Sequence, residues 1–384
     1  MSNKQTLVDI INLNAEASCL STKRWLRALK GGNKSELYAI LSLYVKAELK
    51  VTLGIVGSTL AEIEEFNPEC IELINQHPNN FEILIRPFIH SLSILWTNET
   101  FIHNYELGKR YIEDRLKNCI NWYLPPEFAL RNSHIYALQN LKCEGTFIHP
   151  KRVKNDIKSK LPKGVFTLAS IQNVKMPCIN FTEGYDTYYL DQMQVFRSNI
   201  TFKENTIYGW RDGESPLFLT DSVKREEIFI ENSKKEFKRI FLSEALSQTE
   251  NIQKKIVHSY PQNSLLPWLG NFRLFWYTTE IKNIERSFNS LSKTKQIIFL
   301  NLLNSDILSS IEKNDVTITL KELGNGESSQ FLIKRKERNL DAEEILFLIN
   351  NFDDENIKSY IESANSKFFI KIKARYKAAL SVTS

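Results

Sequence analysis

The sequence predicts an α/β fold in which parallel strands alternate with helices, followed by a mainly helical second part. Up to about residue 215, short apolar runs alternate with longer amphipathic runs. From residue 223 onward, long segments rich in Lys and Glu replace this alternation. Parallel strands need long crossover connections, and the amphipathic runs are long enough to supply them. The helices of the first part should therefore cover both faces of a parallel sheet or surround a barrel.

About seven strands fit before residue 215, each a short run rich in β-branched or aromatic residues. Helices are expected over 23–49, interrupted near Gly31 and Gly32, over 59–75, and up to about residue 117. The expected strands are residues 8–13, 50–56, 81–88, 119–124, 145–148, 165–170 and 206–210.

The second part is expected to be a helical bundle. Helices are predicted over 224–246, 251–258, 274–291 and 294–310. Within 316–335, two apolar runs flank a turn-rich segment, which indicates a β-hairpin. The sequence contains no internal repeat and no low-complexity linker. We therefore expect a first domain over 1–222 and a helical subdomain over 223–384 that packs directly on it.

Composition indicates a large globular protein without a nucleic-acid partner. The chain has 384 residues, of which 42% are hydrophobic, enough for a large core. Its 50 basic and 45 acidic residues leave only a small positive excess. The basic clusters at 234–239 and 334–338 are interleaved with Glu, which is typical of solvated surfaces.

Cysteine usage and hydropathy indicate a cytoplasmic protein without a membrane partner. The 5 cysteines are far apart and form no Cys-x-x-Cys pair, so free thiols are expected. Asp9 interrupts the first apolar run, so a signal-peptide core is not expected. No stretch reaches the roughly 18 apolar residues of a membrane span.

Glu127 is the most informative acidic residue. It follows the strand-like run 121–124 and two prolines. In α/β barrels, the loops after the carboxyl ends of the strands converge on one face, where catalytic groups collect. Glu127 is therefore a candidate catalytic carboxylate. The alternative is that it opens a helix, because acidic residues favour a first helical turn.

Four short motifs, in this order, resemble those of glycoside hydrolase family 57 over about residues 6–300. The resemblance implies an incomplete (β/α)7 barrel followed by a helical subdomain, a carbohydrate substrate, and kinship with the NodB-like polysaccharide deacetylases. The motifs are the third-strand segment 81–92, the nucleophile segment 122–127, the aromatic-Arg-Asp segment 210–212 that carries the acid/base, and a bundle helix at 274–282.

One motif departs from the family pattern. The first strand of the family usually ends in a histidine followed by Gln-Pro or a similar pair, whereas residues 13–18 put Glu16 near that place. Glu16 could contact sugar hydroxyls in place of the histidine or bind a cationic amino sugar. It could also mark a branch whose chemistry is lost or changed.

The resemblance implies that Glu127 is the nucleophile and Asp212 the acid/base. Cleavage with retention of configuration needs two carboxyl groups about 5 to 5.5 Å apart. Both residues follow expected strands, so a barrel can bring them to the same mouth. Glu214 is the rival of Asp212 and otherwise a candidate substrate contact. Ordinary turn chemistry around Gly213 is the alternative explanation of Asp212. Hydrolysis and transfer to another sugar both remain open.

Five further residues are candidate substrate contacts. Aromatic rings stack on sugar rings, while arginine donates a planar fork of hydrogen bonds and holds neighbouring acids ionised. For Trp122 the alternative is a core position, for Arg86 neutralisation of Glu82, and for the histidine a structural role. The candidates are Arg86, His90, Trp122, Trp210 and Arg211.

Two other functions compete with glycoside cleavage. NodB-like deacetylases hold a metal with an Asp-Asp pair and a His-x-x-x-His pair, and the sequence has neither, leaving only Glu16, His90 and His103 as a conceivable set. Without these two patterns no metal is expected, and without a nucleotide-binding glycine motif no cofactor is expected. The altered first motif also leaves open a catalytically degenerate carbohydrate-binding protein.

Overall fold

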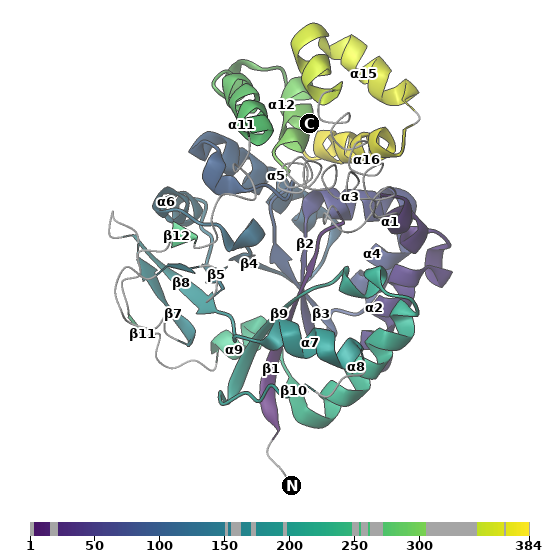
Figure 1. Ribbon diagram of the computed structural model, residues 1–384, viewed down its shortest axis with the longest axis vertical. Coiled ribbons are helices and arrows are strands. Elements are labelled where there is room, and N and C mark those ends of the chain that lie inside the picture. Colours follow the sequence, from purple (N-terminus) through teal and green to yellow (C-terminus); the bar gives the residue numbers. More distant parts are fainter. Residues whose placement is uncertain are drawn as a thin grey trace, which may run out of the picture.

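The fold is built around a mostly parallel sheet that curls into an incomplete barrel, with helices around it (Figure 1). This confirms the predicted fold class. The predicted hairpin at 316–335 and Glu16 lie outside the described residues. The computed structural model describes residues 4–15, 22–149, 153–154, 163–169, 174–194, 198–247, 253–254, 260–261, 272–304, 344–364 and 366–383.

Strand β1 (Gln5–Leu13) is the centre of the sheet, with β9 (Thr206–Asp212) on one side and β2 (Val51–Ile55) on the other, both parallel to it. The sheet then continues in parallel through β3 (Phe81–Ile85), β4 (Cys119–Tyr123), β5 (Gly145–Ile148) and β8 (Lys175–Asn180).

The barrel stays open between β8 and β9. Within the described residues, no strand pairing joins these two strands. A backbone hydrogen bond from Thr182 N to Tyr208 O, 2.9 Å long, spans the gap just beyond β8. β7 (Gly164–Ala169) pairs with β8 in antiparallel orientation, so the predicted strand there exists but does not follow the parallel pattern. Two further short pairings are β11 (Gln253–Lys254) on β7 and β12 (Tyr260–Pro261) on β6 (Val153–Lys154).

The barrel helices follow the amphipathic runs of the sequence. The predicted helix over 23–49 divides where Gly31 and Gly32 adopt positive φ angles of 114° and 57°. Pro68 divides the helix predicted over 59–75. The helices are α1 (Thr22–Leu29), α2 (Glu36–Lys46), α3 (Gly57–Phe66), α4 (Glu69–Gln76), α5 (Asn98–Arg115), α6 (Asn132–Asn140), α7 (Tyr185–Met193) and α8 (Ser222–Glu236).

Both faces of the sheet are buried, so a strand such as β1 contributes to two apolar clusters. Val8 and Ile10 of β1 point into the barrel, whereas Leu7 and Ile11 pack outward against the helices. This alternation follows from the two-residue period of a strand. Helices that cover a parallel sheet bury its outer face as well.

The barrel sheet extends beyond residue 222. β10 (Phe237–Arg239) pairs with β1, and α9 (Leu242–Ser247) follows it. Leu242 joins the inner cluster and donates its backbone N–H to Glu82 Oε1 at 3.0 Å. The single helix predicted over 224–246 is therefore wrong, because a strand interrupts it. The helix predicted over 251–258 is likewise wrong at residues 253–254, which form β11.

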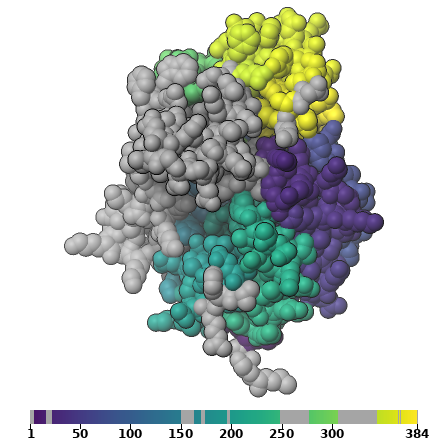
Figure 2. Space-filling model, turned by 45° about the vertical axis from the view of Figure 1, so that its right-hand side comes forward, coloured from purple at the N-terminus to yellow at the C-terminus, as the bar shows by residue number. Residues whose placement is uncertain are grey.

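Helices near the end of the chain pack at one end of the barrel (Figure 1). Figure 2 shows the yellow C-terminal segment against the purple N-terminal helices. Arg375 of the last helix joins them, since its Nε donates to Glu62 Oε1 of α3 at 2.8 Å. Among the described helices, none is both long and apolar enough to cross a membrane. These helices are α11 (Phe272–Glu285), α12 (Lys293–Leu302), α15 (Asp354–Ser363) and α16 (Lys367–Ser381).

Candidate active site

Strand β9 delivers Asp212 to the mouth of the barrel. Tyr208 and Trp210 belong to the inner cluster, and the two-residue period of the strand puts Asp212 on the same face. Asp212 is the last residue of β9. It therefore lies at the carboxyl end of a parallel strand, where barrel enzymes carry their reactive groups.

The carboxyl group of Asp212 holds its proton more tightly than a free aspartate. Burial raises its pKa to about 6, and the negative charge of Glu127 adds to the rise. A hydrogen bond of 3.3 Å from Asn12 Nδ2 and the positive charge of Arg86 act in the opposite direction. Asp212 and Glu127 are both partly exposed. The structure thus brings these two carboxylates close enough to interact electrostatically.

Glu127 occupies a strained turn. It lies in the 3-10 turn η3 (Pro126–Phe128) with φ 52° and ψ 15°, and Phe128 follows with φ 54°. Two successive left-handed residues other than glycine are costly, and such strain often accompanies functional sites. The next α-helix begins only at Asn132. Glu127 therefore does not cap that helix, which was the alternative to a role at the mouth.

Arg86 directly follows β3 and lies near the two carboxylates. Its side chain crosses Gly54, where a Cβ would come within 3.4 Å of Arg86 Cδ. Nη1 donates a hydrogen bond to the carbonyl oxygen of Leu124, whereas Nε and Nη2 have no hydrogen-bond partner within the described residues. Burial lowers the pKa of Arg86 to about 10, and the charges of neighbouring acids, Asp212 and Glu127 among them, oppose this shift. The guanidinium thus lies within electrostatic reach of both candidate catalytic groups.

Glu214, the rival of Asp212, is also near the mouth. Its side chain is buried, and Oε2 accepts a hydrogen bond of 3.2 Å from the backbone N–H of Asn14. Its charge reaches Arg86 as well. Glu214 thus ties the end of β1 to the loop after β9.

Trp210 forms an aromatic group with Phe128 and His149. Its ring is 5.0 Å from that of Phe128 in an edge-on arrangement and 6.1 Å from that of His149. This places a partly exposed indole between the turn of Glu127 and the end of β5. Sequence reasoning missed His149, although it follows the strand predicted at 145–148 and so had the same signal as Glu127.

His90 follows β3 and is buried. Burial and the charge of Arg86 lower its pKa well below the usual value, so the imidazole is neutral at pH 7. His103 lies on α5, with its ring 5.3 Å from that of Phe288 near the bundle. Within the part of the chain that is described, no three His, Cys, Asp or Glu side chains form a group that could hold a metal ion.

Trp122 was expected to contact substrate but belongs to the inner core. It is only 3% exposed and packs edge-on against Phe147 with ring centroids 5.5 Å apart. A Cβ on Gly145 would lie 2.5 Å from the indole ring. The glycine thus makes room for an indole that fills the barrel, and the core alternative is the correct one.

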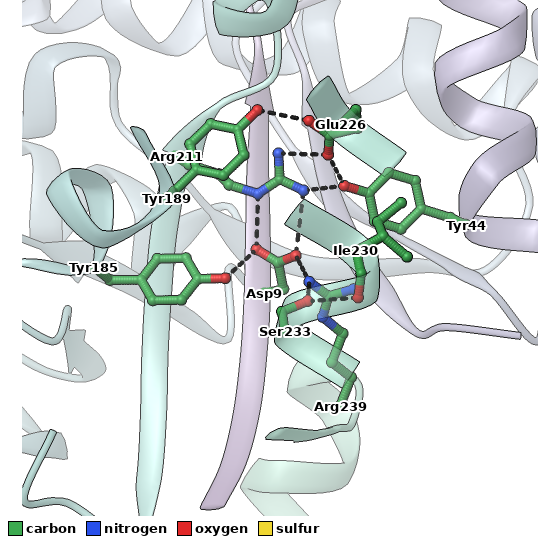
Figure 3. A network of polar contacts seen from close by, with 9 residues as sticks. All are labelled: Asp9, Tyr44, Tyr185, Tyr189, Arg211, Glu226, Ile230, Ser233 and Arg239. Atoms are coloured by element: carbon green, nitrogen blue, oxygen red, sulfur yellow. Dashed lines mark hydrogen bonds and ion pairs between the residues drawn. The ribbon is translucent and has the colours of Figure 1, made fainter. Parts of the chain in front are cut away.

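Arg211 was also expected at the substrate and instead lies on the outer face of β9 (Figure 3). Its Nε contacts Asp9 Oδ1 at 3.1 Å, and its Nη1 contacts Glu226 Oε1 at 3.2 Å. Tyr44 accepts a further hydrogen bond from it. Neighbouring residues of a strand point to opposite faces, so Arg211 cannot share the face of Asp212. This expectation is corrected.

A comparison of the sequence with known protein families agrees with this barrel. A model of glycosyl hydrolase family 57 matches residues 36–228, half of the chain. The chain belongs to glycosyl hydrolase family 57. The resemblance seen in the short motifs is thereby confirmed, and family 57 membership implies a carbohydrate substrate. No curated protein sequence matches the chain.

Solved structures with similar folds include other family 57 enzymes. The GH57-type branching enzyme of Pyrococcus horikoshii superposes with a TM-score of 0.65 at 9% identity, over 98% of this chain and 96% of that one. The 4-alpha-glucanotransferase of Thermococcus litoralis gives 0.61 at 11% identity, over 79% of this chain but only 56% of that one. The exo-type maltose-forming amylase of Pyrococcus sp. ST04 gives 0.56 at 10% identity, over 98% and 74%. At these identities the likeness establishes the family 57 fold.

Proposed function

We propose that this family 57 protein cleaves or transfers glycosidic bonds with retention of configuration, using Glu127 as nucleophile and Asp212 as acid/base. The placement of Glu127 after β4 and of Asp212 at the end of β9 carries the proposal, because the two carboxyl groups lie close enough for the charge of Glu127 to help raise the pKa of Asp212, to about 6. Pairs of carboxyl groups whose environments separate their pKa values are typical of glycosidases.

The proposed reaction has two steps. Glu127 attacks the anomeric carbon while Asp212 gives its proton to the leaving glycosidic oxygen. The resulting glycosyl-enzyme ester is then cleaved by water or by a sugar hydroxyl, from which Asp212 takes a proton. Arg86 favours the ionised form of Glu127, since opposite charges favour ionisation.

Trp210 and His90 are the proposed sugar contacts beside Arg86. The partly exposed indole of Trp210 offers an apolar face for a sugar ring. A neutral imidazole at His90 can exchange hydrogen bonds with hydroxyl groups. Glu16, which lies outside the described residues, remains a proposed contact from the sequence.

We propose α-glucans as the first substrates to test. Support comes from the names of the similar enzymes, which include a 4-alpha-glucanotransferase, a branching enzyme and a maltose-forming amylase. Maltooligosaccharides and aryl α-glucosides therefore form the test panel. Analysis of the products separates hydrolysis from transfer.

The test replaces each acid in turn. Glu127→Gln keeps shape and hydrogen bonding but removes the attacking charge, so kcat should fall by about three orders of magnitude or more. In Glu127→Ala, added azide should restore turnover and give a glycosyl azide of inverted configuration. Asp212→Asn should lose most activity on substrates with poor leaving groups. Glu214→Gln is the matched control and should change kcat far less. Wild-type turnover in Glu127→Gln would exclude Glu127 from the chemistry.

The same assay distinguishes the two competing functions. Cleavage by paired carboxylates needs no cation, so activity should survive exhaustive chelation. Acetate release that stops on chelation and returns with a divalent metal would favour a deacetylase. Binding of sugar without turnover would favour a degenerate binding protein, a possibility that the end of β1 supports, since Asn12 and Asn14 stand there without a histidine.

A further inference from the structure

Asn12 is the residue of β1 that faces the candidate active site. It pairs with Asp212 of β9 on one side and with Gly54 of β2 on the other. Val8 and Ile10 point into the barrel, so the strand period puts the Asn12 side chain on the same inner face. Because Gly54 has no side chain, the Arg86 side chain passes over it toward the same place. Asp212, Asn12 and Gly54 thus lie side by side on three neighbouring strands, and the Arg86 side chain lies over the last of them.

Backbone pairing fixes the position of Asn12, whereas its side-chain amide is oriented by a hydrogen bond to Asp212. Asn12 is only 6% exposed, and its carbonyl oxygen accepts the backbone N–H of Gly213 at 2.6 Å. The side-chain Nδ2 donates to Asp212 Oδ1 at 3.3 Å. Asn12 Oδ1 is buried and has no hydrogen-bond donor within the described residues. Among those residues, Asp212 alone therefore orients this amide.

Some groups around Asp212 raise its pKa, and others lower it. Burial and the negative charges of Glu127 on η3 and Asp186 on α7 favour the protonated form. Arg86, at the end of β3, favours the ionised form through its charge, and Asn12 does so through its hydrogen bond. Within the described residues, Asn12 is the side chain shown to donate a hydrogen bond to this carboxylate.

We propose that Asn12 is a positioning residue that orients Asp212 and weakens its hold on the proton, an inference that rests on the proposed function. An acid/base must release its proton in the first step and take one in the second, so its affinity for the proton has to stay near the working pH. Without the amide, burial and the neighbouring acids would keep Asp212 protonated to higher pH. In the glycosyl-enzyme the charge of Glu127 is lost to the ester, but burial and the charge of Asp186 would still favour protonated Asp212. The breakdown step, which needs Asp212 as base, would then be slow.

The first measurement is independent of activity. The protein is labelled with ¹³C at the aspartate carboxyl carbons, and the Asp212 resonance is assigned by its loss in Asp212→Asn. In Asn12→Leu, which removes the donor at similar volume, the Asp212 pKa should rise by about one unit. In Asn12→Asp it should rise further, because a second carboxylate then faces Asp212. An unchanged Asp212 titration in Asn12→Leu would overturn the proposal.

The second measurement is the pH profile of kcat/KM. The alkaline limb of Asn12→Leu should move up by the same amount as the Asp212 titration, and kcat should fall more than KM changes. A lower rate with an unmoved limb would assign Asn12 a structural role and overturn the proposal. If the Asp212 resonance shifts while the wild-type protein cleaves no glycoside, the proposed function fails and the effect of Asn12 on Asp212 stands.

Asn121→Leu is the matched control. Asn121 is on β4, but it points outward, where its amide accepts from Tyr105 and donates to the carbonyl oxygen of Lys142. This variant should lower the unfolding temperature without moving the Asp212 titration. A shift of the Asp212 pKa in this control would show that any loss of an amide in the barrel has the effect, and would overturn the assignment to Asn12.

Discussion

The two aspartates on neighbouring strands show how the face of a strand decides the chemistry of a residue. Asp212 faces the barrel interior, where burial and Glu127 raise its pKa. Asp9 faces outward; burial there opposes ionisation too, but the charges of Arg211 and Arg239 outweigh it and hold the pKa below the usual value. The first carboxyl group can exchange a proton near neutral pH, whereas the second is a permanent anion.

At the residue scale, we predict that activity falls as the pH rises through about 6. The proposed acid must be protonated in the free enzyme, and the protonated fraction of Asp212 decreases tenfold per pH unit above its pKa of about 6. The alkaline limb of kcat/KM, measured on a substrate with a poor leaving group, should therefore bend near that value. Aryl glycosides with good leaving groups need little protonation, so their kcat/KM should fall less as the pH rises. A flat profile between pH 5 and 8 on both substrates would contradict the role of Asp212.

At the scale of elements, a buried charge network joins strands to the helices behind them. Asp9 of β1 lies between Arg211 of β9 and Arg239 of β10, at 3.1 Å and 3.3 Å (Figure 3). Glu226 of α8 pairs with Arg211 and accepts hydrogen bonds from Tyr44 of α2 and Tyr189 of α7. Arg211 is thus anchored on the outer face between two residues of the candidate site, Trp210 and Asp212.

We predict that Asp9→Asn lowers the free energy of unfolding by about 3 to 5 kcal/mol, since it leaves two buried guanidinium groups without this partner. Urea denaturation at pH 7 measures the loss. Glu113→Gln is the control, because its pair with Lys109, 3.8 Å long and partly exposed, should contribute less than about 1 kcal/mol.

The sign of the pH dependence gives a second check. The folded-state pKa of Asp9 is lowered, so its contribution to stability is present above the unfolded value and disappears as the pH falls through the folded value. The stability difference between wild type and Asp9→Asn should therefore shrink only in strong acid. A constant difference down to pH 2 would contradict the ionised state of Asp9.

At the scale of the whole molecule, late segments of the chain complete structure that begins at its start. β10 adds to β1, and Leu242 of α9 fills the inner cluster. Farther along, Arg375 of α16 pairs with Glu62 of α3 and also donates to Asn301 of α12 at 3.1 Å. Described segments of the second part thus either complete the barrel, as β10 and α9 do, or pack on its helices, as α16 does.

We predict that a fragment ending at residue 222 is insoluble. It lacks β10 and α9, so the edge of β1 beside residues 5–7 and part of the inner apolar cluster would be exposed. Expression followed by sedimentation, with the full chain as control, tests this. A soluble fragment with cooperative thermal unfolding would instead support the domain boundary that the sequence predicts at 222.

Local patterns alone predicted most strands of the barrel and the helices between them. The strands at 50–56, 119–124, 145–148 and 206–210 are correct to within a few residues, because their apolar runs are short and bounded by breakers. β8 was missed: Pro177 falls inside it, and proline argues against an interior strand. β10 was missed because a three-residue strand has no periodicity of its own and depends on pairing with β1.

For the site, the sequence by itself determined which acids follow strands and which neighbours share a face. The two-residue period already separates Arg211 from Trp210 and Asp212. Tertiary structure alone decided which face is the interior, since both faces of a covered parallel sheet are apolar and the pattern of one strand cannot distinguish them. It also brought Asn12 beside Asp212, a contact between residues 200 positions apart. Such contacts depend on which strands are neighbours in the sheet, and no local sequence signal encodes that arrangement.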